Sequence, residues 1–250
     1  MISLKKITTK GKALYLAYDQ GLEHGPEHDF NDKNINPLYI IDIAKKSKYN
    51  GLIFHKGIAE KYHKEIVKSK VPLILKLNGK TKLVKGEPIS AQIATVDEAV
   101  KLKAAAVGFT IYLGSQHEAK MIEQFEEIQS LAHKKDIPVI VWMYPRGKAV
   151  KNDTSKEMMA YSTRVALEIG ADMVKLKYGN NPENLKWSVK CAGRVKVVVA
   201  GGTKVNESTL LKQTKEIMSS GAIGMAIGRN VWQHPNPLIL TKKLKEIIWK

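Results

Sequence analysis

A lysine inside an apolar stretch is the side chain of this sequence best suited to covalent chemistry. Lys175 lies within the segment DMVKLKY at positions 172–178. In a β-strand, Lys175 and Lys177 would share one face, and the apolar Val174 and Leu176 would share the other. In a barrel strand, the face that packs against the surrounding helices has to be apolar, which Val174 and Leu176 satisfy. We therefore expect Lys175, on the other face, to point into the barrel.

A buried Lys175 has two interpretations. Burial and a neighbouring amine both lower the pKa of a lysine, and a neutral amine attacks a carbonyl carbon to give a Schiff base. Alternatively, its ammonium group forms a structural ion pair with a carboxylate such as Asp19 or Asp172. The spacing alone favours neither interpretation.

Two glycine-containing turns indicate a phosphate site. Gly201-Gly202 ends one apolar run, and Gly228-Arg229 ends the next run along the chain. Glycine lets backbone N–H groups approach an anion closely, and an arginine adds a fixed positive charge. Either pair alone would indicate only a tight turn, but two adjacent pairs favour phosphate binding.

An aromatic pair comes next to a further arginine. Trp142 and Tyr144 share a strand face by the same two-residue period. Core packing is the usual role of such a pair. Tyr144, however, directly precedes Pro145 at the end of its run, and Arg146 continues the polar rim. We therefore expect the Tyr144 phenol to exchange protons with a substrate.

Histidine spacing does not favour a metal centre. The one pair with suitable spacing, His24 and His28, lies in a Gly/Pro-containing loop together with Glu27 and Asp29. These four side chains could bind a metal ion in principle, but an entry loop is the favoured interpretation. We expect no metal and no cofactor.

The elements that must position these residues follow a regular alternation of apolar runs and amphipathic segments. Eight runs resemble strands covered on both faces: 13–19, 51–55, 72–77, 106–112, 138–145, 172–178, 195–201 and 223–229. Eight segments resemble helices: 37–48, 58–67, 96–103, 118–134, 155–169, 182–191, 207–219 and 235–249.

Eight strand–helix units in 250 residues predict the α/β class and a single (β/α)8 TIM barrel that forms one domain over residues 1–250. An open doubly wound sheet is the alternative. Its dinucleotide fingerprint is missing, because the first strand ends in Tyr18-Asp19-Gln20-Gly21. In a barrel, active sites lie at the C-terminal ends of the strands, where Asp19 and the other candidates occur.

The composition restricts the kinds of binding partner and the cellular compartment that we expect for this protein. The chain has 41 Lys and Arg residues against 24 Asp and Glu, a formal charge of +17. Only four of the basic residues are arginines and the lysines are dispersed, which favours a solvated surface over nucleic-acid binding. Cys191 is the only cysteine. A lone cysteine, no signal peptide and no apolar run of membrane-spanning length predict a cytoplasmic protein without membrane partners.

With these residues in hand, the chain resembles the archaeal-type (DhnA-type) class I fructose-1,6-bisphosphate aldolases. The resemblance runs from the first strand to the last. It is carried by LAYDQGLEHGP (16–26), FHKGIAEKY (54–62), VPLILKLNGKTKL (71–83), VGFTIYLGS (107–115), VIVWMYPRG (139–147), VKLKYGNNP (174–182), VAGGTK (199–204) and AIGRNVWQ (226–233).

The resemblance implies a metal-free (β/α)8 barrel that cleaves a phosphorylated sugar and forms a homo-oligomer. It also implies roles for residues. Lys175 would form the Schiff base, Asp19 would hydrogen-bond the substrate hydroxyls and the lysine, and Tyr144 would transfer protons. The remaining candidates would bind substrate. Trp142 and Lys177 would contact it in the pocket. One phosphate would bind at Gly201, Gly202, Gly228 and Arg229, and Arg146 would bind the other phosphate.

The chain departs from many relatives at two positions, with Gln20 in place of His and Ala200 in place of Ser. These departures leave the exact ketose phosphate open. A related Schiff-base enzyme, the transaldolase-like synthase that makes aromatic-amino-acid precursors (2-amino-3,7-dideoxy-D-threo-hept-6-ulosonate synthase), is the alternative. A nucleic-acid-binding protein on a barrel scaffold, suggested by the charge alone, is a third hypothesis.

Overall fold

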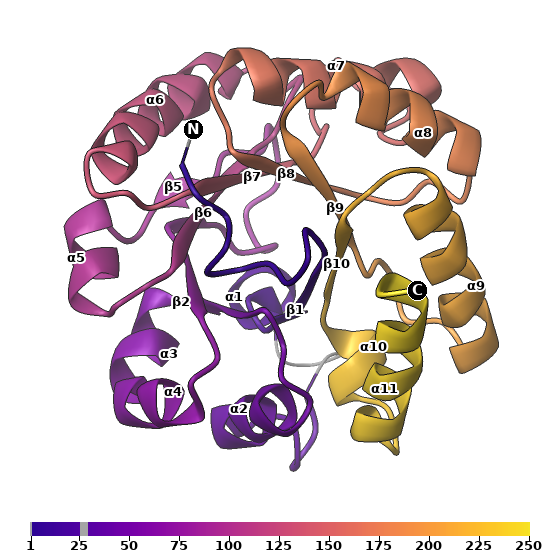
Figure 1. The fold of residues 1–250 in the computed structure, drawn as a ribbon. Helices are drawn as coiled ribbons and strands as arrows, with labels where there is room; N and C mark the ends of the chain where they lie inside the picture. The colour runs from indigo at the N-terminus through magenta and orange to yellow at the C-terminus, as the bar shows by residue number, and fades with distance from the viewer. Residues whose placement is uncertain (1, 26–29) are drawn as a thin grey trace.

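The computed structural model describes residues 2–25 and 30–250 (Figure 1). The loop residues Glu27, His28 and Asp29, which the sequence analysis considered as metal ligands, lie outside the described residues.

Eight parallel strands close into a barrel, in the ring order β1-β10-β9-β8-β7-β6-β3-β2. The strands are β1 (Ala13–Ala17), β2 (Gly51–His55), β3 (Leu73–Lys76), β6 (Ala106–Ile111), β7 (Val139–Met143), β8 (Met173–Leu176), β9 (Lys196–Ala200) and β10 (Gly224–Ile227). Each strand falls within one of the eight predicted runs, so the predicted barrel is confirmed.

Helices surround the strands on the outside (Figure 1). They are α2 (Pro37–Lys46), α3 (Lys56–Lys61), α4 (His63–Ser69), α5 (Val96–Lys101), α6 (Glu118–His133), α7 (Lys156–Glu168), α8 (Pro182–Cys191), α9 (Glu207–Ser219) and α11 (Pro237–Ile248). Capping residues set several of their starts. Thr95 and Glu98 form a reciprocal capping box at α5, and the Asn181 side chain accepts two backbone N–H bonds at α8.

The prediction of a single helix over residues 58–67 is wrong. The backbone at Tyr62 has φ −112° and ψ 22°, outside the helical range. Two short helices, α3 and α4, therefore meet there instead.

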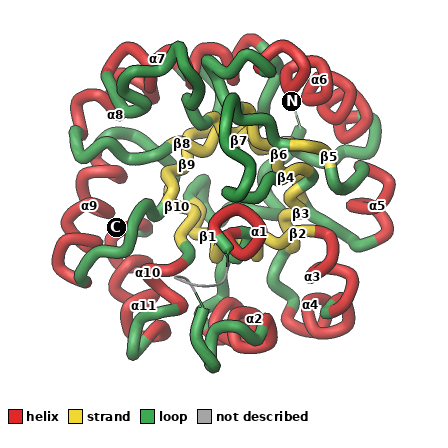
Figure 2. The backbone as a smooth tube through the Cα atoms, turned by 180° about the vertical axis from the view of Figure 1, so that it is seen from behind, coloured by secondary structure: helices red, strands yellow, loops and turns green. Residues whose placement is uncertain are grey.

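Four short elements beyond the eight-unit pattern lie in the loops that follow strands: α1 (Gln20–His24), α10 (Arg229–Trp232), and an antiparallel pair made of β4 (Asn78–Gly79) and β5 (Ala91–Gln92). Figure 2 shows α1 over the middle of the ring of strands. Elements of two to five residues are too short to produce a hydrophobic period, which is why the sequence pattern did not reveal them.

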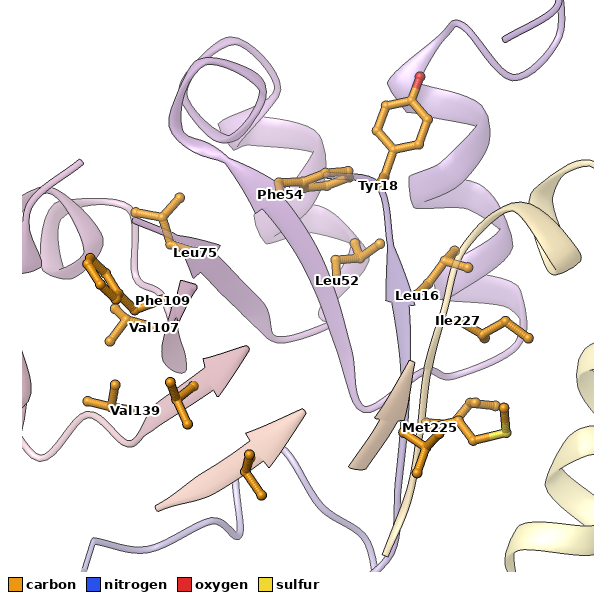
Figure 3. Close-up of a cluster of buried hydrophobic side chains, with 14 of the residues drawn as sticks. Leu16, Tyr18, Leu52, Phe54, Leu75, Val107, Phe109, Val139, Met225 and Ile227 are labelled. Carbon is orange, nitrogen blue, oxygen red and sulfur yellow. The ribbon is translucent and has the colours of Figure 1, made fainter. Parts of the chain in front are cut away.

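Buried side chains form two layers. The outer layer packs the barrel against the helices, and Figure 3 shows part of it, including Leu75, Val107 and Phe109. The inner layer fills the barrel and includes Ile7, from the N-terminal segment, and Met173. Val174 and Leu176 belong to the outer layer and Met173 to the inner one, as the two-residue period predicts. Among the described residues, no helix has the length and apolar character needed to cross a bilayer.

Candidate active site

One cavity of about 380 Å³ is lined by all ten residues that the sequence analysis proposed as site residues. They come from the ends of five strands and the loops that follow: Asp19, Trp142, Tyr144, Arg146, Lys175, Lys177, Gly201, Gly202, Gly228 and Arg229. Gln20 and Ala200, the two departures, also line the cavity. Residues up to 210 positions apart therefore meet in one pocket, because parallel strands place their C-terminal ends at the same rim.

Lys175 points into the barrel and is 5% exposed. Its Nζ atom lies 4.8 Å from the ring centroid of Trp142. Burial is the largest cause that lowers the pKa of Lys175, and the charge of Lys76 lowers it further. The carboxylates of Asp19 and Glu23 oppose this effect without cancelling it. The lowered pKa makes the uncharged, nucleophilic form of Lys175 easier to reach than in an exposed lysine.

The two carboxylates considered as ion-pair partners of Lys175 have different surroundings. Asp172 precedes β8 and accepts hydrogen bonds from His133 Nε2 and from the backbone N–H of Val139, both at 2.8 Å. Asp19 lines the cavity and is 7% exposed. Burial pushes its pKa upward, but Lys175, Lys76, His55 and a backbone hydrogen bond together outweigh burial and hold the pKa below its usual range.

Tyr144 and Trp142 lie on the inner face of β7 and its extension. Trp142 is 1% exposed. The pKa of Tyr144 is raised well above its usual value, first by burial and then by the negative charges of Asp19 and Glu23. The phenol therefore keeps its proton at neutral pH and can donate it into the cavity.

Two glycine turns form one wall of the cavity. Gly202 has φ +65°, and no atom of the described residues lies within 4 Å of the point where a Cβ would be, so that part of the chain leaves its backbone open to a ligand. Asn230 ties the turns together, because its Nδ2 donates to Gly201 O at 2.8 Å and to Thr203 O at 3.0 Å. Gly228 directly precedes α10, the short extra helix that barrels often use at a phosphate site.

Arg146 and Lys177 stand at the rim of the same cavity. The Arg146 guanidinium lies 5.3 Å from the ring centroid of Tyr112. Lys177 forms an ion pair with Asp153, which fixes the loop after β7 beside the cavity. Both cations are partly exposed, so they can meet an anionic group that enters from solvent.

The sequence analysis assigned no role to a second buried lysine at a strand end. Lys76 ends β3 and is 0% exposed, and its Nζ lies 5.4 Å from the ring centroid of Trp142. Nζ donates to Glu23 Oε1 and to the Asn78 carbonyl oxygen, both at 3.1 Å. The available signal was the one that revealed Lys175, a lysine within the apolar run PLILKL.

His55 is a further strand-end residue to which the sequence analysis assigned no role. It is buried at the end of β2, and neither ring nitrogen has a hydrogen-bond partner among the described residues. Burial and the charge of Lys76 lower its pKa, so the ring is uncharged at neutral pH. Within residues 2–25 and 30–250, no three His, Cys, Asp or Glu side chains are grouped as a metal ion would require.

Comparison with known proteins identifies aldolases, both among family models and among individual relatives. Residues 13–234 match the model of the DeoC/LacD family of aldolases. The chain is 47% identical over 249 residues to the fructose-bisphosphate aldolase class 1 of Thermoproteus tenax, covering 98% of this chain and 93% of the relative. It is 40% identical over 245 residues to the enzyme of the same name from Halobacterium salinarum, with 98% and 93% coverage.

A solved structure is similar throughout. It is an archaeal fructose-1,6-bisphosphate aldolase whose catalytic lysine is covalently bound to the carbinolamine intermediate of the substrate. The TM-score is 0.93 at 45% identity, and the match covers 99% of this chain and 98% of that one. The family match over most of the chain, the near-full-length relatives and the lysine-lined cavity lead to one conclusion: this chain belongs to the DeoC/LacD family of aldolases.

Proposed function

We propose that this protein is a class I, Schiff-base-forming fructose-bisphosphate aldolase, a carbon–carbon lyase. The observation that carries the proposal is the buried amine of Lys175, which faces the same cavity as the protonated phenol of Tyr144. The similarity to fructose-bisphosphate aldolases over nearly the full length supports the same activity.

The reaction begins at Lys175. Its neutral amine attacks the C2 ketone of fructose 1,6-bisphosphate, and loss of water from the carbinolamine leaves an iminium ion. The iminium accepts the electrons of the C3–C4 bond as a base removes the C4 hydroxyl proton, and glyceraldehyde 3-phosphate departs. The enamine is then protonated at carbon, and water releases dihydroxyacetone phosphate and regenerates the amine.

Tyr144 is the proposed proton-transfer residue, because its phenol is protonated and lines the cavity beside Lys175. Asp19 is the proposed partner of the substrate hydroxyls and of the Lys175 amine. Its lowered pKa keeps it ionised, so it can accept hydrogen bonds throughout the cycle. Trp142 shapes the pocket by packing against Lys175.

The two phosphates are assigned to two groups of cavity residues. Gly201-Gly202 and Gly228-Arg229 are proposed to bind one phosphate through backbone N–H groups and the guanidinium. Arg146 and Lys177 at the rim are proposed to bind the other. The formal charge of +17 would draw the anionic substrate towards the protein.

We also propose the cellular setting. The enzyme acts in glycolysis and gluconeogenesis in the cytoplasm, as a single-domain barrel over residues 1–250 that assembles into a homo-oligomer. The family resemblance and the lone cysteine support these assignments.

Borohydride trapping tests the proposal. The protein is incubated with fructose 1,6-bisphosphate or dihydroxyacetone phosphate, reduced, digested and analysed by mass spectrometry. We expect a triose phosphate adduct on Lys175, none in Lys175→Met, and a retained adduct in the matched variant Lys177→Met. An adduct on Lys177 instead would mean that the nucleophile is misassigned. Cleavage rates for other ketose phosphates, measured in parallel, would establish whether fructose 1,6-bisphosphate is the preferred substrate.

A further inference from the structure

The buried Lys76 is a charged group that the proposed reaction does not use. The mechanism requires one amine nucleophile, and Lys175 supplies it. A second ammonium that is 0% exposed is costly to bury and needs a physical reason.

Lys76 is held rigidly by two partners. Its Nζ donates to the Asn78 carbonyl oxygen at 3.1 Å. The Asn78 side chain is itself fixed on Thr110, because its Nδ2 donates to Thr110 O at 2.8 Å and its Oδ1 accepts from Thr110 N at 2.7 Å. The second partner is Glu23 Oε1 at 3.1 Å, and Glu23 belongs to α1, the helix that lies over the barrel (Figure 2).

The indole of Trp142 brings the two lysines together. Lys76 Nζ lies 5.4 Å and Lys175 Nζ 4.8 Å from the same ring centroid. The two nitrogens are therefore at most about 10 Å apart, a distance at which two like charges inside a protein repel appreciably. Trp142 packs against both side chains and is almost fully buried, so this arrangement leaves little bulk water between them.

The other charged and titratable groups around this pair come from several elements. They are Asp19 and Glu23 after β1, His55 on β2, Tyr112 after β6, Tyr144 and Arg146 after β7, and Lys177 after β8. The carboxylates favour a charged Lys175, and Lys76 opposes them. Lys76 is thus the buried cation that offsets the two acids at the nucleophile.

We infer that Lys76 is a positioning residue for catalysis, and that its ammonium group, anchored by Glu23 and the Asn78 carbonyl, keeps the Lys175 amine in its uncharged, nucleophilic form. The inference rests on the proposed Schiff-base function of Lys175. A purely structural role for the Lys76–Glu23 pair is the alternative, and it would alter stability without altering the titration of Lys175.

Two variants with opposite expected effects separate these roles. Lys76→Met removes the repelling charge and should raise the pKa of Lys175 by about one unit, from the repulsion of two charges at this separation. Glu23→Gln removes an attracting charge but keeps an oxygen that can accept the Lys76 hydrogen bond, so it should lower the pKa. Lys196→Met removes the same charge as Lys76→Met at an exposed site where β9 begins, and should cause no shift.

The primary readout needs no sugar substrate. Each folded variant is labelled with acetic anhydride over a pH series, and the modification of Lys175 is quantified by peptide mass spectrometry. The second readout is the acidic limb of the pH profile of kcat/KM for fructose 1,6-bisphosphate cleavage. In Lys76→Met we expect this acidic limb to move about one pH unit higher, so that kcat/KM falls by up to about tenfold on the limb and recovers about one pH unit above it.

Three outcomes would overturn the inference. They are an unshifted Lys175 midpoint in folded Lys76→Met, shifts in the same direction for Lys76→Met and Glu23→Gln, or an equal shift in Lys196→Met. If Lys76→Met does not fold, the direction of the Glu23→Gln shift decides. Wild-type protein that does not cleave the sugar would refute the proposed function, whereas active wild-type protein with unmoved midpoints would refute this inference alone.

Discussion

Gly108 is a glycine whose replacement would act directly on the nucleophile's surroundings. It lies on β6 with its missing side chain directed at Trp142. A Cβ at this position would lie 2.1 Å from Cζ3 and 2.2 Å from Cη2 of the indole, whereas ordinary contacts begin at 3.4 Å. Gly108→Ala therefore requires the ring to retreat by about 1.3 Å to restore ordinary van der Waals contact.

The cost follows from the packing around the ring. Trp142 is 1% exposed, so the indole cannot move without displacing other buried groups. Overpacking of this kind costs about 1–3 kcal/mol. For a domain of this size the melting temperature should fall by roughly 2–12 °C. Because Lys175 Nζ packs 4.8 Å from the ring centroid, a shift of this size should also lower kcat by about 100-fold.

Urea unfolding and steady-state cleavage assays would measure both effects. Trp142→Phe removes the two clashing carbons, so the double variant Gly108→Ala, Trp142→Phe should be more stable than the sum of its single variants by about 1–3 kcal/mol. Gly57→Ala is the matched control, because none of the described residues has an atom within 4 Å of its Cβ position. A Gly108→Ala protein with wild-type stability and kcat, or an undiminished penalty in the Trp142→Phe background, would refute the steric argument.

Four further variants test other parts of the molecule. Tyr144→Phe should reduce kcat by about 10²–10⁴-fold while the borohydride adduct on Lys175 still forms, and an unchanged kcat would exclude Tyr144 from proton transfer. Arg229→Ala should raise KM for the bisphosphate more than it lowers kcat; steady-state kinetics would show the opposite pattern if Arg229 does not contact phosphate. Ile7→Ala should cost about 2–5 kcal/mol in urea unfolding without changing KM, because Ile7 is buried in the inner barrel layer; full stability would contradict that burial. Thr95→Ala should cost about 0.5–2 kcal/mol in the same assay through loss of the capping box, and no change would mean that the cap is not formed in solution.

The sequence was sufficient to predict the barrel and the inward direction of its key side chains. Both depend on local periodicity. A run such as 172–178 assigns alternate residues to opposite faces whatever the rest of the chain does, so Lys175 could be placed inside and Val174 outside before any contact was known. The capping residue Thr95 is a local signal of the same kind, read from neighbouring positions only.

The second lysine shows what the sequence did not decide. Lys76 and Glu23 are 53 residues apart in the sequence, and the proposed role of each depends on its contact with the other. Their contact needs closure of the barrel and the exact placement of α1, a helix of five residues that has no period of its own.

The sequence by itself therefore determined the fold, the end of the barrel where the proposed site residues gather and the inward direction of Lys175, because backbone periodicity and strand direction dictate these features. Only the tertiary structure decided which charges face Lys175 and how Trp142 packs between the two lysines. Those features depend on distances of a few ångströms between segments that the local pattern does not connect.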